Sequence, residues 1–343
     1  MRAFVLAVSI AACLLSVECG PATPTGALPV PRSGTPASAR PSPQLCVSGA
    51  TTPSDHFALV HGCITYTDGS KIWAVDPNHP ANRISLGPSN GRTPIAWSRD
   101  GSRLLLVERR NAGTAQEAKD LYVMNADGSQ IRLTSDGNSG EGSFSPDGAR
   151  VVFSRQDDGL YVVDVKGGAP RLIAKSYLAW WLATPSWSPD GSRIAYTVYV
   201  EGGPGGLGYR IWTVNPDGTG QRQFIDLGEC RANCAGGLAW SADGSRLAFH
   251  SAHRTQNPVL VFGIYVVNAD GSGLHRVNDN GTQPFWSPDG SRLGFILVDR
   301  TPTNGPWGGQ LFTMAADGSD QRQVEGVGAV IPFGSVWTWN PVK

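Results

Sequence analysis

The sequence has no excess of charge of either sign. Its 343 residues include 28 Lys and Arg and 28 Asp and Glu, which cancel. A protein that grips nucleic acid or an anionic membrane surface normally carries a basic excess, because neutralised phosphates release their counterions. We therefore expect neither nucleic acid nor an anionic lipid surface as a charge-driven partner.

The N-terminal apolar run of the sequence is too short to span a membrane. Residues 3–17 are too few to cross about 30 Å of hydrocarbon, and Arg2 precedes them in the order of a secretory signal. We interpret residues 1–19 as a signal peptide. Residues 20–55 are rich in Pro, Ala, Thr, Ser and Gly, a composition that cannot bury enough apolar surface to fold. They predict a tether.

The signal, Cys19 and the Pro-rich tether together resemble a bacterial lipoprotein, in which the cysteine thiol takes the lipid. Glu18 stands before Cys19 where that family has a small residue, whereas Ile10-Ala11-Ala12-Cys13 fits better but follows a very short apolar run. Lipidation at Cys19 or Cys13 and plain secretion both remain open. Each implies an exported protein, either a lipid-anchored envelope protein or a secreted or periplasmic one.

Glycine and proline are abundant, and they recur in a repeated turn. The tetrapeptide Ser-x-Asp-Gly returns at intervals of 43 to 53 residues. Asp bonds the local backbone and Gly supplies the left-handed residue of a tight hairpin. The copies begin at Ser98, Ser145, Ser188, Ser241 and Ser287. A period of this length is typical of propellers.

Strand patterns surround each turn. An aromatic residue precedes it and an apolar run follows it, which predicts two strands, a and b. A third strand, c, is predicted at 121–124, 160–163, 211–214, 264–267 and 311–314, and a short fourth, d, at Arg132, Arg171, Arg222, Arg276 and Arg322. Four antiparallel strands make one propeller blade.

The two ends of the chain predict a sixth blade. Residues 72–75 form a further strand c that has no strand a before it, and the C-terminal Trp337-Thr338-Trp339-Asn340-Pro341 copies the strand-a pattern. A blade that joins both ends closes the ring and leaves no free sheet edge. The predicted fold is an all-β, six-bladed propeller over 56–343, and we expect a monomer.

The repeat resembles that of TolB-like propellers. The resemblance is carried by Trp-Ser-Pro-Asp-Gly-Ser-Arg-x-Ala-Tyr from Trp187 and by Ile-Trp-Thr-Val-Asn-Pro-Asp-Gly from Ile211, and it covers roughly residues 62 to 341. Propellers of this type serve as periplasmic protein-binding scaffolds, as gating domains of peptidases and as sugar-active or surface proteins. The resemblance therefore implies the fold more than the function.

The topology predicts which face binds a partner. The b-to-c and d-to-a connections leave the face opposite the tight turns, and binding residues concentrate on long loops. These connections are 108–120, 174–184, 199–209, 226–237, 250–263, 299–309 and 325–335. Aromatic candidates for a partner-binding face are Tyr177, Trp180, Trp181, Trp307 and Phe333. The alternative is that they pack locally as caps of the blades.

Four cysteines lie outside the signal region. In an exported chain they suggest two disulfides, Cys46 with Cys63 and Cys230 with Cys234. The alternative is zinc held by Cys230, Cys234 and two histidines of His250-Ser251-Ala252-His253. We favour disulfides and expect no metal and no cofactor.

The residues do not predict an active site. Gly87-Pro88-Ser89-Asn90-Gly91 matches G-x-S-x-G but lies in a propeller connection, and the chain has no room for an added hydrolase domain after its last blade. The acidic residues Glu141, Asp157, Asp158 and Glu201 reach the predicted binding face without forming a recognisable pair. We explain the Asp of each repeated turn by hydrogen bonds within its own turn, and the Arg two residues after each turn Gly is a candidate to pair with it between blades.

Two functional hypotheses follow. The first is a non-catalytic scaffold that binds a protein or glycan at the cell envelope. The second is a propeller enzyme that acts on a polysaccharide or small ester at the channel mouth.

Overall fold

The structure is a computed structural model. It describes residues 57, 62–111, 114, 116–156, 158–175, 185–203, 206–225, 227, 235–254, 260–299, 308–324 and 338–339. The chain divides into two units, Met1–Pro43 and Gln44–Lys343, and all described residues belong to the second. The predicted signal peptide and tether lie outside them. Within the described part, no helix is long and apolar enough to cross a membrane.

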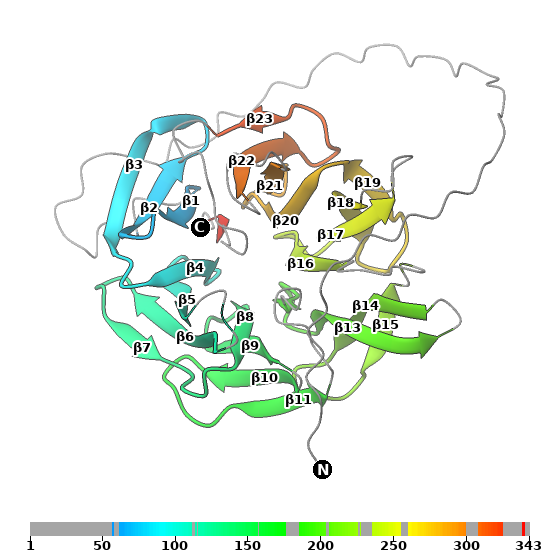
Figure 1. Cartoon of the computed structure of the whole chain (residues 1–343), viewed down its shortest axis with the longest axis horizontal. Helices are drawn as coiled ribbons and strands as arrows, with labels where there is room; N and C mark the ends of the chain where they lie inside the picture. The colour runs from blue at the N-terminus through cyan, green and yellow to red at the C-terminus, as the bar shows by residue number, and fades with distance from the viewer. Residues whose placement is uncertain are drawn as a thin grey trace. The chain divides into compact units, whose positions relative to one another are not determined.

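Six four-stranded antiparallel sheets surround a centre, as predicted (Figure 1). We number these blades I to VI in the order of their inner strands around the ring, beginning with the blade that contains both ends of the described chain. Blades I to III contain β24 (Thr338–Trp339), β1 (Ile64–Thr67), β2 (Lys71–Asp76) and β3 (His79–Pro88); β4 (Arg92–Trp97), β5 (Arg103–Arg110), β6 (Ala118–Asn125) and β7 (Gln130–Arg132); β8 (Ser139–Phe144), β9 (Arg150–Arg155), β10 (Gly159–Asp164) and β11 (Arg171–Lys175). Blades IV to VI contain β12 (Ser186–Trp187), β13 (Ile194–Gly203), β14 (Gly206–Val214) and β15 (Arg222–Ile225); β16 (Ala235–Trp240), β17 (Arg246–Arg254), β18 (Leu260–Asn268) and β19 (His275–Asn278); β20 (Gly281–Trp286), β21 (Arg292–Asp299), β22 (Gly308–Ala315) and β23 (Arg322–Gln323).

Blade I confirms the predicted closure. β24 pairs with β1 in the register Ile64 with Trp339 and Thr65 with Thr338, and β1 pairs in turn with β2. The C-terminal strand therefore completes a sheet whose other strands come from the start of the propeller. Closure removes the unpaired edge that an isolated three-stranded sheet would expose.

The core consists of hydrophobic clusters between neighbouring blades. Side chains alternate along a strand, so each blade presents one set to each neighbour. In β9, Val151 and Phe153 pack against blade II, whereas Val152 packs against blade IV. All three are fully buried, and each such side chain contributes roughly 1.5–3 kcal/mol to stability.

The repeated Ser-x-Asp-Gly turns are closed by a shared set of hydrogen bonds. In the first copy, the Ser98 hydroxyl donates to Asp100 at 2.7 Å and accepts from the Arg103 amide at 2.9 Å. Gly101 has a φ of 68°, where a side chain would be strained. In later copies the hydroxyl bonds from Ser188 and Ser241 lower the pKa of Asp190 and of Asp243 to about 2.

The prediction that the turn Asp residues pair with the following Arg residues is wrong for the described residues. The carboxylates are already occupied by their own turns. Four of the five Arg side chains reach the next blade instead, whereas Arg292 pairs with Asp320 of its own blade at 2.8 Å. Three of them stack on its tryptophan ring, with 4.6 to 5.0 Å from the guanidinium carbon to the ring centroid: Arg150 on Trp187, Arg193 on Trp240 and Arg246 on Trp286. The periodic Arg residues are structural, as expected, but the partner of three of them is a tryptophan ring.

Several predicted long loops are partly strand. The b and c strands of blades IV and V extend as hairpins beyond their sheets, so most of 199–209 belongs to β13 and β14. Likewise β17 continues to Arg254 before β18 begins at Leu260. The two strands of each hairpin continue to pair after the neighbouring strands a and d have ended, as Tyr199 does with Tyr209 and His253 with Val261.

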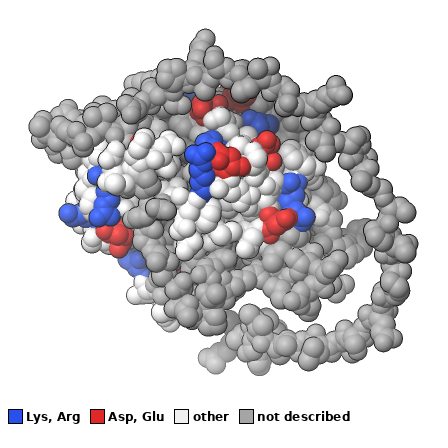
Figure 2. Space-filling view, turned by 90° about the horizontal axis from the view of Figure 1, so that it is seen from above, with Lys and Arg blue, Asp and Glu red and all other residues white. Residues whose placement is uncertain are grey.

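Charged side chains do not form a field of one sign on the surface. On the face seen in Figure 2, the Lys and Arg side chains lie beside Asp and Glu in small mixed groups. Most of the visible described surface carries no charge. This agrees with the balanced composition of the chain.

Candidate functional site

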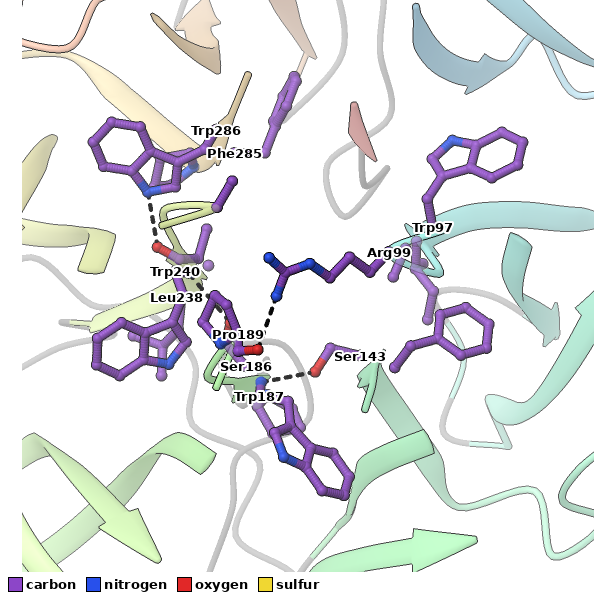
Figure 3. A pocket seen from close by; sticks show the side chains of 18 of the residues that line it. Trp97, Arg99, Ser143, Ser186, Trp187, Pro189, Leu238, Trp240, Phe285 and Trp286 are labelled. Carbon is purple, nitrogen blue, oxygen red and sulfur yellow. Dashed lines mark hydrogen bonds between the residues drawn. The ribbon is translucent and has the colours of Figure 1, made fainter. Parts of the chain in front are cut away.

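The inner strands of five blades enclose a cavity in the centre of the ring. Its volume is about 280 Å³, and its lining comes from β4, β8, β12, β16 and β20 and from the tight turns that follow them. Ile95, Leu238 and Phe285 contribute to a mainly apolar wall. In Figure 3 the tryptophan rings point outward between the blades, so mostly the backbone of these residues faces the cavity.

The tight turns line one end of the cavity. The second residue of the turn is Pro146, Pro189, Ala242 or Pro288 in four blades, and all of these line the cavity. Blade II has Arg99 at this position. Its exposed side chain extends across the opening, and Nη1 donates to the Pro189 carbonyl of blade IV at 2.8 Å (Figure 3). This bond links two blades that are not neighbours.

The cavity has a positive electrostatic character. Arg99 is the one permanently charged side chain among its described lining residues, which include no Asp or Glu. Asp100, the nearest acid in sequence, is bonded to Ser98 and Ser102 of its own turn. An anion in the cavity would therefore meet a cation without a competing carboxylate from the lining.

Gln283 holds a strained backbone conformation in the cavity wall. Its φ is 52°, at a bulge in β20, and the corresponding residue of blade V is Gly237 with a φ of 60°. A left-handed residue other than glycine costs roughly 1 kcal/mol. Blade VI thus carries a polar side chain where glycine would be easier to accommodate.

His250 supports this bulge. It lies in β17, and its Nδ1 accepts a hydrogen bond from the Gln283 amide at 3.2 Å. Burial lowers the pKa of His250 to about 4, so the ring is neutral at pH 7 and carries its proton on Nε2. A Cβ on Gly237 would lie 2.8 Å from the same Nδ1, which explains glycine there.

The aromatic residues predicted to bind a partner lie outside the described residues. This applies to Tyr177, Trp180, Trp181, Trp307 and Phe333, and also to Cys19, Cys46, Cys230 and Cys234. Cys63 is fully buried directly before β1. The binding face, the lipidation site and the disulfide pairing therefore stay predictions.

The described residues contain no group of three or more His, Cys, Asp or Glu side chains able to hold a metal ion. The acidic residues predicted to reach the binding face are not among the described residues that line the cavity. Asp158 accepts a hydrogen bond from Tyr161, Asp157 lies outside the described residues, and the side chains of Glu141 and Glu201 are not among those described.

The G-x-S-x-G match is confirmed as accidental. Ser89 is buried in the turn between β3 and β4, and its hydroxyl donates to the Gly69 carbonyl at 2.6 Å. It therefore stabilises a turn and is not presented as a nucleophile.

Sequence reasoning missed Arg99 and Gln283. Aligning the repeats would have shown Arg99, because three sister turns carry proline at its place, but not Gln283, whose position differs from blade to blade. What alignment cannot show is that the two positions line one cavity.

A ring of six four-stranded blades around a channel defines the protein as a six-bladed β-propeller. Residues 156–333 match the family model PD40, the TolB beta propeller domain. Because the match covers more than half of the chain, the protein belongs to this family.

Among relatives, a Tol-Pal system protein TolB from Anaeromyxobacter dehalogenans strain 2CP-C is 33% identical over 143 residues. That match covers 40% of this chain and 29% of the relative. A TolB from Anaeromyxobacter sp. strain K is 31% identical over 143 residues, which again cover 40% of this chain and 29% of the relative. The chain thus matches less than a third of the length of these relatives.

Solved structures agree on the fold. TolB from Acinetobacter baumannii has a TM-score of 0.59 at 18% identity, covering 82% of this chain and 67% of that one. A putative TolB from Agrobacterium tumefaciens has a TM-score of 0.55 at 22% identity, covering 76% and 87%. The GH74 xyloglucanase of Xanthomonas campestris reaches 0.52 at 12% identity, covering 79% and 44%. At these identities the likeness concerns the fold alone.

Proposed function

We propose that the protein is an exported, non-catalytic scaffold whose propeller binds a protein or glycan partner at the cell envelope. The observation that carries the proposal is the composition of the channel. Its described lining offers no carboxylate pair and no activated nucleophile, and its serines are largely engaged in turn and strand bonds. Hydrolysis of a glycoside or ester needs such groups at the reacting centre.

The family supports a binding role over catalysis. Relatives that match part of this chain carry the name of the Tol-Pal system, and a β-propeller supplies a rigid ring on which loops can present contacts. Aromatic loop residues suit such a contact because they bury a large area at low entropic cost. We place the partner site on the loop face, with Tyr177, Trp180, Trp181, Trp307 and Phe333.

Export and anchoring belong to the same proposal. Residues 1–19 direct export, 20–55 hold the propeller away from the envelope, and Cys19 is the proposed lipid site. Disulfides between Cys46 and Cys63 and between Cys230 and Cys234 would pin the entering chain and one loop. Mass measurement of the mature N-terminus and of the non-reduced peptides tests these assignments.

The binding role is tested with the double variant Trp180→Ala/Trp181→Ala. In-cell crosslinking would identify a candidate partner, which is then purified for measurement of Kd. We expect the variant to lose at least about tenfold in affinity, because interface aromatics are frequent hot spots. Leu274→Ser, which changes an exposed residue before β19, is the matched control and should bind like the wild type.

Two results would contradict the proposal. One is unchanged affinity of the tryptophan variant for the purified partner. The other is turnover of polysaccharides or small esters by the purified protein, abolished by substitution of residues in the channel.

A further inference from the structure

A departure from the internal repeat and a strained residue lie in one cavity. Arg99 stands where three of the four other described inner turns have proline, and Gln283 stands where the neighbouring blade has Gly237. Elsewhere the repeat is kept because it makes turns and blade contacts. A cation and a residue with a strained backbone in the cavity wall are not explained by turns or blade contacts, so they are candidates for a role in ligand binding.

The Arg99 guanidinium is only partly used by the fold. Nη1 donates to the Pro189 carbonyl, and the described residues provide no other hydrogen bond or ion pair for it. The remaining N–H groups lie at the turn end of the cavity. The guanidinium is planar, so it can donate two parallel hydrogen bonds to one carboxylate. Arg99 is therefore placed to hold an anionic group.

Gln283 supplies a second polar contact. Its backbone amide is committed to His250, but its side-chain amide has no hydrogen bond to a described residue. Between these polar points the wall is mainly apolar, with Ile95 and Leu238. The volume of about 280 Å³ lies just below the range of roughly 300–1,000 Å³ usual for small-molecule sites, which indicates a ligand of modest size.

We propose that the channel cavity binds a small monocarboxylate with an apolar body, its carboxylate on Arg99 and its far end near Gln283. This site goes beyond the scaffold function. It uses the tight-turn end of the channel, whereas the proposed partner site uses the loops of the opposite face.

The probes are 4-phenylbutyrate and 4-phenylbutanamide, which share shape and size and differ in charge. Titration calorimetry should show one site for the carboxylate, with Kd around 1 mM or below, as expected for a small ligand, and binding of the amide weaker by about tenfold. Raising the salt concentration should weaken binding of the carboxylate more than binding of the amide, because salt screens the charge of Arg99.

Arg99→Pro introduces the residue that three sister turns carry, and Gln283→Gly introduces the residue that blade V carries, so both variants are expected to fold. Arg99→Pro should lower carboxylate affinity by about tenfold and leave the affinity for the amide nearly unchanged. Gln283→Gly should weaken binding several-fold while its Tm stays equal or rises, because the strained residue is removed. Arg322→Ala is the control. It removes an equal charge from the outer strand of blade VI, where the Arg322 side chain is 67% exposed, and the variant should bind the carboxylate like the wild type.

The proposal is overturned if neither probe binds at about 10 mM, where a ligand of this strength would be near saturation. It is also overturned if Arg99→Pro keeps the wild-type preference for carboxylate over amide. Neither result bears on capture of the macromolecular partner, which the tryptophan variant tests separately.

Discussion

The junctions between neighbouring blades solve one packing problem in two ways. At the III/IV, IV/V and V/VI junctions an Arg of one blade stacks on the strand-a Trp of the next, as Arg193 does on Trp240 at 4.7 Å. The II/III junction has Phe144 in place of that Trp, and Arg103 donates to the Gly148 carbonyl at 3.4 Å.

What the II/III junction has instead is a buried carboxylate. Asp120 in β6 is fully buried and accepts from Arg110, from Arg132 at 2.8 Å and from the Gly137 amide at 3.1 Å, in the segment leading to blade III. The comparison shows that blades built from the same repeat can be stabilised near their junctions by different polar contacts, an Arg–Trp stack or an ionic network. Such a network depends on every member, because an unpaired buried charge is costly.

The largest expected effect is at Asp120. Asp120→Ala leaves two guanidinium groups and the Gly137 amide without their acceptor, and we expect a loss of about 3 to 5 kcal/mol in the free energy of unfolding. Urea unfolding measures it. Asp127→Ala, in an exposed turn of the same blade, is the control and should cost far less. Equal losses would refute a special role of the Asp120 network.

The V/VI junction should weaken at acidic pH through His250. Its folded pKa of about 4 lies below the ordinary value of 6.5, so its contribution is complete above about pH 6.5 and is lost as the pH falls toward 4. The difference corresponds to roughly 3 kcal/mol between these limits. Urea midpoints of wild type and His250→Gln at pH 7, 5.5 and 4 measure it. A wild-type protein with the same pH slope as the variant would contradict the assignment.

The same junction should be sensitive to an added methyl group. In Gly237→Ala the Cβ would lie 2.8 Å from His250 Nδ1 and 3.0 Å from the Gln283 Cα, at a φ of 60°. We expect a loss of about 2 kcal/mol from overpacking and backbone strain. Gly69→Ala is the control, because it has a positive φ but open space around its Cβ. Thermal unfolding that shows no difference between the two would mean that only φ matters.

The smallest effect should separate the two kinds of junction directly. Arg193→Ala loses a stack on Trp240 and a hydrogen bond to the Ala269 carbonyl at 2.8 Å, together worth about 1 to 2 kcal/mol. Arg103→Ala should cost about half as much, because Arg103 makes a longer bond. Chemical unfolding of both variants tests this order. If Arg103→Ala cost more, the stacks would not distinguish the junctions.

Most of the fold could be predicted because its signals are local. The Ser98 turn and its four copies need only a hydroxyl, an Asp and a Gly within four residues, and the bonds observed at Ser98 follow from that spacing. Blade number and closure followed from counting repeats and from the strand c at 72–75, which has no strand a before it in the sequence. Hydrogen bonding of the turn Asp residues within their own turns was predicted correctly. The candidate Arg–Asp pairs failed because the repeat does not show that Arg150, Arg193 and Arg246 meet a tryptophan ring of the next blade.

The candidate site was less predictable. His250 was noticed as a metal ligand candidate, yet its observed partner is the Gln283 amide in the next blade. Arg99 was hidden in a turn whose second position tolerates many residues.

The amino-acid sequence by itself determined the strands, the turns, the six-fold count and the closing blade, because these depend on periods of two and of about 43 to 53 residues. Only the tertiary structure decided that Arg99 meets Pro189 across the channel and that His250 carries the bulge at Gln283. The physical reason is that a repeat specifies how a blade folds and meets its neighbours. Contacts across the ring arise only after closure brings distant turns around a common axis.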